Sequence, residues 1–156
     1  MTEGRTCGRC TACCTHMSIE ELHKIEGETC YLVRKEGCSA YSERPPSCRD
    51  FQCLWLMGAG KDSHRPDRSN VLVYAENSPK LGNVVAITEM IPNGLRNPKA
   101  QGMLKELKRA KRNLYIRRKD GTVSLQGSEE FVKKGQEIKD GLDKEKAAKV
   151  RLKVIA

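Results

Sequence analysis

Cysteine is the residue type in this sequence whose number and spacing point most directly to chemistry. All eight cysteines lie before residue 54, and the longer remainder of the chain has none. Four of them form a CxxCxxCC run and four follow singly: Cys7, Cys10, Cys13 and Cys14, then Cys30, Cys38, Cys48 and Cys53. Paired cysteines a few residues apart usually supply half of a four-ligand metal site. The spacing therefore predicts that all eight are metal ligands.

The expected compartment supports this prediction. The N-terminus has no apolar stretch of the kind that a secretory signal requires, and no apolar run approaches the roughly 20 residues that span a bilayer. We therefore expect a cytoplasmic protein that does not act in a membrane. In a reducing cytoplasm a dense set of cysteines favours metal ligation. Disulfide-linked or simply buried cysteines are the alternative.

The number of thiols indicates how many metal ions can bind and which metals are candidates. Eight thiolates suffice for two tetrahedral sites, and zinc is the metal we predict. Adjacent Cys13 and Cys14 point in different directions, so they can serve different metals, or Cys14 can be a non-ligand. An iron–sulfur cluster is the alternative cofactor, because four thiolates suit it equally. His16, which follows the run, is a less favoured substitute ligand.

Short elements must position these cysteines. We expect a helix over residues 19–26, hairpin strands over 30–33 and 38–41, and a distorted helical segment over 48–57. Ser18 and Glu21 fit a capping box for the first helix, and Ser47 is a plausible N-cap for the last. The hairpin would place Cys30 and Cys38 near each other at its open end.

The remainder of the chain alternates strand and helix patterns. We expect strands over 71–74 and 83–90, an amphipathic helix over 98–112, strands over 114–117 and 123–125, a helix over 128–140, and a weakly strand-like piece over 150–155. The predicted fold class is α+β, with a small metal-stapled, Cys-rich N-terminal subdomain over residues 1–60. It would pack on a small mixed α/β remainder over residues 61–156, within one compact domain.

Charge is distributed unevenly along the chain. Residues 1–98 contain 12 basic and 12 acidic side chains, whereas residues 99–156 contain 17 basic and 8 acidic ones. The net charge of +9 therefore lies in the C-terminal part. This basic part is a candidate surface for an acidic protein or a nucleic acid. An aromatic content of only 4% argues against single-strand binding by base stacking.

The cysteine string occurs together with other motifs. Arg44-Pro45 precedes Cys48, Cys53 is followed by Leu-Trp-Leu, and residues 65–69 read Arg-Pro-Asp-Arg-Ser. Over residues 7–74 the chain resembles the CxxCxxCC family of zinc- or iron-chelating proteins, also called the YkgJ-type cysteine cluster family. The resemblance implies a metal-chelating cysteine domain, with the ligand role carried onto all eight cysteines. It implies no settled activity.

The motifs of common enzyme classes are missing from the sequence. GxSxG, HExxH and P-loop patterns do not occur, so hydrolase and nucleotide-binding functions have no support, and enzymatic activity stays open. The predicted function is metal binding, with zinc in a structural or metal-handling role. The alternatives are an iron–sulfur redox protein and a zinc-stabilised nucleic-acid-binding module.

Overall fold

A computed structural model describes the backbone of residues 4–155 and the side chains of residues 4–146. Residues 1–3 and 156, the outer ends of the two predicted regions, lie outside the described residues. The helices and strands of the described part are α1 (Ala12–His16), β1 (Val33–Arg34), β2 (Gly37–Cys38), α2 (Pro46–Asp50), α3 (Pro66–Ser69), β3 (Val71–Ser78), β4 (Gly82–Glu89), α4 (Pro98–Arg109), β5 (Leu114–Arg117), β6 (Val123–Gln126) and α5 (Glu129–Ile155). Short 3-10 helices lie at Glu20–Leu22, Tyr41–Glu43, Asp62–His64 and Gly94–Arg96. The fold contains helices together with a two-stranded and a four-stranded sheet. This mixed composition agrees with the predicted α+β class.

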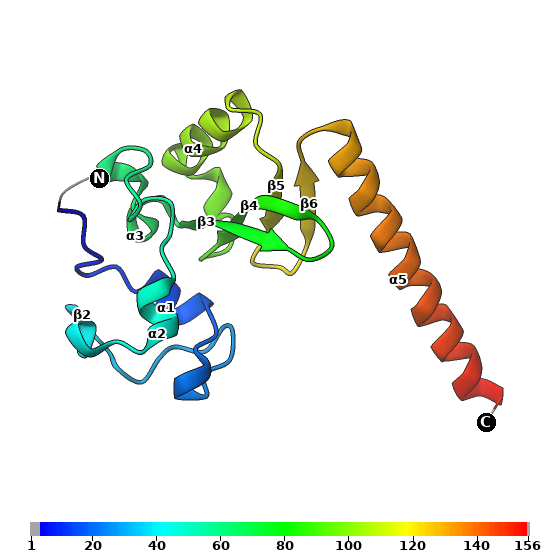
Figure 1. Cartoon of the computed structure of the whole chain (residues 1–156), viewed down its shortest axis with the longest axis horizontal. Helices are drawn as coiled ribbons and strands as arrows, with labels where there is room; N and C mark the ends of the chain where they lie inside the picture. Colours follow the sequence, from blue (N-terminus) through cyan, green and yellow to red (C-terminus); the bar gives the residue numbers. More distant parts are fainter. Residues whose placement is uncertain (1–3, 156) are drawn as a thin grey trace.

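The larger sheet has the strand order β3-β4-β5-β6. Strands β3 and β4 form an antiparallel hairpin in which Val71 lies opposite Glu89. Strands β4 and β5 are parallel, so they need a crossover connection, and helix α4 supplies it (Figure 1). Strand β6 returns antiparallel to β5. The predictions of strands and of an amphipathic helix in this part are confirmed, and β3 extends four residues beyond the predicted end at residue 74.

The main core lies between helix α4 and one face of this sheet. Alternate residues of a strand share a face, which places apolar side chains of three strands against the helix. The cluster consists of Val71, Val73, Val85, Ile87, Leu95, Ala100, Met103, Leu104, Leu114 and Ile116. Leu114 is fully buried and Ile87 is 1% exposed. Full burial of such a side chain stabilises a fold by roughly 1.5–3 kcal/mol. The second half of the chain thus has a core of its own.

The cysteine-bearing region is attached to the outer edge of the sheet. The backbone N–H of Leu54 donates to the carbonyl of Val73 over 2.8 Å, so the segment after α2 runs along edge strand β3. Phe51 packs edge-to-face on Tyr74, with ring centroids 5.3 Å apart. Neighbouring strand residues point to opposite faces, and Leu54 packs against the main core. This segment therefore contacts both faces of the sheet at its edge.

The predicted helix over residues 19–26 is wrong. Only the 3-10 helix Glu20–Leu22 forms there, and no side chain caps it. The Glu21 carboxylate accepts a hydrogen bond from the backbone N–H of Ser47 over 3.0 Å instead of serving a local capping box. A tertiary contact therefore replaces the local one that the sequence pattern predicted.

The other short elements of the N-terminal region differ from prediction mainly in length. The hairpin forms, but its strands β1 and β2 have two residues each. Helix α2 covers only the beginning of the predicted 48–57 segment, and its N-cap is Pro45 rather than Ser47. The irregular backbone that follows Asp50 agrees with the expected distortion, because a cysteine spacing of five does not suit one helical face.

The C-terminal helix α5 is longer than predicted. It continues past residue 140 as a helix of 27 residues, so the strand-like assignment of residues 150–155 is wrong. Its beginning packs on β6, where a Cβ added to Gly135 would lie 2.0 Å from the Leu125 side chain. The rest of the helix runs away from the sheet (Figure 1). In the described part of the chain, no helix is long and apolar enough to cross a membrane.

Candidate metal centre

Seven of the eight cysteines line one cavity of about 180 Å³ in the N-terminal region: Cys7, Cys10, Cys13, Cys14, Cys30, Cys38 and Cys48. Much of the remaining lining is apolar and includes Met17, Ile19, Leu22, Leu32 and Phe51. All eight cysteines are free thiols. Cys53 does not line this cavity. Four separate parts of the chain therefore deliver predicted ligands to one place.

The CxxCxxCC run is shaped by a tight turn and a short helix. The N–H of Cys10 donates to the carbonyl of Cys7 over 2.8 Å, and α1 begins two residues later. Gly37 of β2 packs against the Gly8 carbonyl so closely that a Cβ would lie 2.3 Å from its oxygen. Only glycine permits this approach, which brings the hairpin onto the run.

The cysteines that follow the run in sequence lie near Cys14 in the folded chain. The N–H of Cys30 donates to the carbonyl of Cys14 over 2.9 Å. Cys38 pairs with Val33 in the hairpin, so Cys30 lies just beyond the paired strands, as expected, and shares the cavity with Cys38. Cys48 lies on α2, where burial and then repulsion from the thiolates of Cys14, Cys30 and Cys38 raise its pKa.

Backbone N–H groups point at the sulfurs of Cys10 and Cys53. Burial raises the pKa of Cys10, while N–H groups of Ala12 and Asp67 oppose that rise. Burial likewise raises the pKa of Cys53, opposed by the N–H of Leu56, which lies 3.5 Å from its sulfur. Such N–H donors stabilise a thiolate and so favour its use as a metal ligand.

Cys13 and Cys14 interact directly. The thiol of Cys13 donates to the sulfur of Cys14, which raises the pKa of Cys13 and lowers that of Cys14 to about 7. Burial opposes the lowering at Cys14, and the positive charges of Lys24 and Arg44 assist it.

The two cations near Cys14 are held by tertiary contacts. Lys24 is only 6% exposed, and its ammonium donates to the carbonyls of Met17 and Ile25. The Arg44 guanidinium stacks on the ring of Tyr41, 3.8 Å from the centroid. The role of Lys24 beside the cysteines could not be predicted from the sequence, because no local pattern marks a lysine that only the folded chain buries. Arg44 was flagged as part of the Arg-Pro element.

The Arg-Pro-Asp-Arg-Ser element also lies beside the cysteines. Arg65 forms a two-pronged ion pair with Asp67 at 2.6 and 2.7 Å, and the Asp67 N–H reaches Cys10. Arg65 and Arg5 both stack on Trp55, at 5.8 and 4.9 Å from its ring centroid. These contacts connect α3, the N-terminal loop and the segment after Cys53.

The donor set fits a thiolate-bound metal. Thiols, N–H donors to sulfur and nearby cations are the groups that stabilise an anionic metal–thiolate unit. Within residues 4–146, however, no group of three or more Cys, His, Asp or Glu side chains is already positioned to hold a metal ion. Sulfur binds zinc at about 2.3 Å, so metal binding would require the thiol side chains to move from the positions that they have in this structure.

The substitute ligand His16, which is half-buried, and the buried His64 both lie elsewhere. His16 lies in a separate hollow with Glu26, Tyr74 and Arg117, where burial followed by the charge of Lys119 lowers its pKa. His64 is 5% exposed and borders a larger cavity. Neither lines the cysteine cavity.

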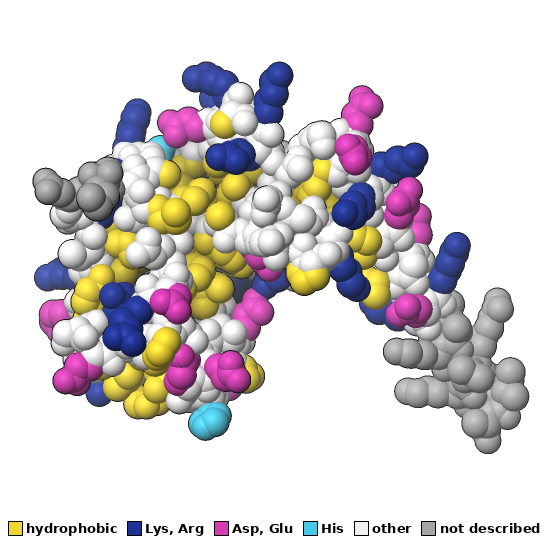
Figure 2. Space-filling view, viewed as in Figure 1, with side chains coloured by type: hydrophobic (Ala, Val, Ile, Leu, Met, Phe, Trp, Pro, Cys, Tyr) yellow, Lys and Arg dark blue, Asp and Glu magenta, His cyan; other side chains and the backbone are white. Residues whose placement is uncertain are grey.

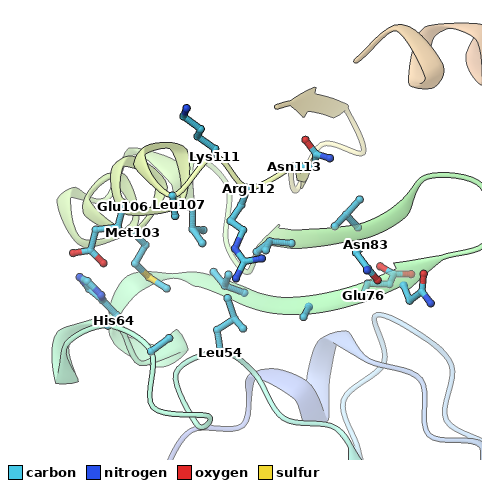
Figure 3. A pocket seen from close by; sticks show the side chains of 18 residues that line it. Leu54, His64, Glu76, Asn83, Met103, Glu106, Leu107, Lys111, Arg112 and Asn113 are labelled. Carbon is cyan, nitrogen blue, oxygen red and sulfur yellow. The ribbon is translucent and has the colours of Figure 1, made fainter. Parts of the chain in front are cut away.

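The larger cavity, of about 790 Å³, lies between the sheet, helix α4 and the segment around Leu54. Figure 2 shows hydrophobic side chains gathered in this hollow, and Figure 3 shows Arg112 pointing into it beside Leu54. Its rim is polar and includes Glu106 and Asn113. No sequence motif predicts this hollow, because its walls come from parts of the chain that only the fold brings together. No cysteine lines it.

Comparison of this chain with protein-family models, with curated proteins and with solved structures finds no match. The resemblance to the CxxCxxCC family therefore remains a prediction that rests on the motifs quoted above.

Proposed function

We propose that this protein binds metal through its eight cysteines, with zinc as the metal and a structural or metal-handling role. The observation that carries the proposal is the gathering of seven cysteines around one cavity.

The architecture of the N-terminal region supports a structural role. Its strands have two residues each, and its helices α1 and α2 have five each. Of the buried apolar residues, this region supplies only Ala12, Ile19, Cys30 and Trp55. Small regions with so little core generally need disulfides or a metal to fold. Zinc held by four thiolates is such a structural element, because a closed site leaves no position for a substrate.

The environment of the sulfurs supports a bound thiolate. N–H groups approach Cys10 and Cys53, and the cations of Lys24 and Arg44 lie near Cys14. Four thiolates around one Zn²⁺ carry a net charge of −2, so each of these groups favours the loaded state. They would hold and orient the ligands, and exclude competing protons from them.

Metal analysis of the full chain, purified with and without oxygen, tests the proposal. We expect about two zinc ions per chain, a colourless solution, and thiols protected from alkylation until a chelator is added. A control sample denatured in chelator should expose all eight thiols. Freely reactive thiols in the folded protein, with no metal retained after zinc is supplied, would refute metal binding.

An iron–sulfur cluster is the second candidate, and the same sulfur environment favours it. Hydrogen bonds to cluster sulfurs and nearby charge are the means by which proteins tune cluster potentials. The anaerobic sample distinguishes the two metals. Visible charge-transfer absorption that bleaches on oxidation, together with iron and acid-labile sulfide, would replace zinc by a cluster.

A further inference from the structure

Four of the cysteines form one neighbourhood around Cys14. A backbone hydrogen bond joins Cys30 to Cys14, and the N–H of Val33 donates to the Cys30 carbonyl over 3.1 Å. Val33 in turn pairs with Cys38. Cys48 lies on α2, where the backbone N–H of the preceding Ser47 donates to the Glu21 carboxylate, in the segment between Cys14 and Cys30. All four line the cysteine cavity.

The other four form a second neighbourhood around Cys7. The turn at the start of the run joins Cys10 to Cys7. Cys13 follows Cys10 by three residues, in the helix α1 that begins just after this turn. Cys53 does not line the cavity, but the segment just after it accepts a hydrogen bond from Arg5, two residues before Cys7.

Arg5 holds the two parts of this second neighbourhood together. Its guanidinium donates to the carbonyls of Trp55 and Ala59 at 2.7 and 2.9 Å, and to that of Gly60 at 2.8 Å. Arg5 lies two residues before Cys7, and Trp55 lies two residues after Cys53. The contact therefore fixes the Cys53 loop beside the start of the run.

The adjacent pair in α1 lies where the two neighbourhoods meet. Successive residues of a helix point about 100° apart, so Cys13 and Cys14 cannot easily turn to the same metal ion. Because the two residues are consecutive in the chain, the two neighbourhoods are adjacent. Cys13 thus belongs to the neighbourhood around Cys7, and Cys14 belongs to the other.

We infer that the cysteines form two adjacent four-thiolate metal sites, one made by Cys7, Cys10, Cys13 and Cys53 and the other by Cys14, Cys30, Cys38 and Cys48. This division rests on the proposed function, because it assigns the ligands of the metal proposed there. The first site is supported by backbone N–H groups of Ala12, Asp67 and Leu56. The second is supported by the charges of Lys24 and Arg44.

Zinc stoichiometry of cysteine variants tests the division. Cys53→Ser and Cys48→Ser should each reduce the zinc content from two ions per chain to one. The double variant Cys10→Ser/Cys53→Ser, within one site, should keep one ion, whereas Cys48→Ser/Cys53→Ser, across the sites, should keep none. Ser42→Ala, at an exposed position near the cavity, is the control and should keep both. Loss of both ions from a within-site double variant that is still folded would overturn the division.

A second measurement needs no variant and so remains informative if the serine variants do not fold. The wild-type chain loaded with ¹¹³Cd should give two metal signals, each coupled to the Cβ protons of the four cysteines named for its site. Couplings that group the cysteines differently, or signals that share a bridging cysteine, would overturn the division while leaving metal binding intact. A wild-type chain that takes up neither zinc nor cadmium would instead refute the proposed function, and the division with it.

Discussion

The two parts of this chain achieve order by different means. Residues 61–146 contribute fourteen of the buried apolar side chains and residues 4–60 contribute four, one of them a cysteine. The sheet and α4 therefore hold together by apolar burial, whereas the cysteine-bearing region consists of short elements around a cavity lined by thiols. The comparison teaches that a region with so little core must take its stability from elsewhere, and the proposed metal would be such a source.

Metal removal should separate the two regions most clearly. A chelator under reducing conditions is expected to unfold residues 4–60 and to leave the sheet folded, because structural zinc sites contribute about 10–16 kcal/mol in small peptides. Hydrogen exchange should show protection lost around Cys30 and retained around Ile87. Cys10→Ser and Cys38→Ser should each lower the melting temperature. Unchanged melting after verified metal removal would contradict the comparison.

A substitution that leaves a cavity in the sheet core should destabilise the sheet region instead of the cysteine-bearing region. Ile87→Ala is expected to lower the free energy of unfolding by about 2–5 kcal/mol, because it empties space beneath α4. The loss should be the same with and without metal, as measured by urea unfolding of the sheet. Ile25→Ala, at a side chain that is 62% exposed, is the matched control and should have little effect. A loss that depends on metal would show that the stabilities of the two regions are not independent.

Lys24 tests the electrostatic support of the cysteines. Lys24→Met keeps most of the side-chain length but removes a buried charge near Cys14. Zinc affinity, measured by competition with a chromophoric chelator, is expected to fall about 10-fold, at the lower end of the effect of changing groups that support metal ligands. Lys35→Met, at an exposed position of the hairpin turn, is the control. Equal affinities of the two variants would mean that Lys24 is merely buried.

Substitutions in the basic C-terminal part should have the smallest effect on stability. Replacing Lys105, Lys108 and Arg109 of α4 by Gln should change the free energy of unfolding by less than about 0.5 kcal/mol per site, because all three are exposed. The same variant tests the nucleic-acid alternative in a gel shift with duplex DNA at two salt concentrations. Binding that weakens with salt and is reduced by the substitutions would support it. No binding of the wild-type chain even at low salt would end it.

The sheet region was largely predictable because its signals are local. A short apolar run marked β3, a stretch rich in β-branched residues marked β4, and apolar residues three and four apart marked α4. A shift of one residue in the register of β3 would turn Val71 and Val73 away from the core beneath α4 and to the opposite face of the sheet. The length of α5 was missed because its final residues were assigned by weak strand propensity, although that segment pairs with no strand.

The N-terminal region was less predictable because its contacts join distant residues. Glu21 fits a capping box by spacing, yet its carboxylate serves Ser47. Asp67 reads as part of a polar loop, yet its N–H points at Cys10 across 57 positions of sequence. Local propensity could not reveal either contact, because short elements take their shape from what they pack against.

The sequence by itself determined that eight thiols would be available, that they would be confined to the first 53 residues, and that the basic charge would lie apart from them. Only the tertiary structure decided which thiols are neighbours. Cys13 and Cys14 are adjacent in the chain, whereas Cys7 and Cys53 come from the two ends of the region and are linked through the hydrogen bonds of Arg5 to the segment after Cys53. The physical reason is that ligand spacing constrains only the cysteines within one turn, whereas the hairpin, α2 and the Arg5 contacts position the rest.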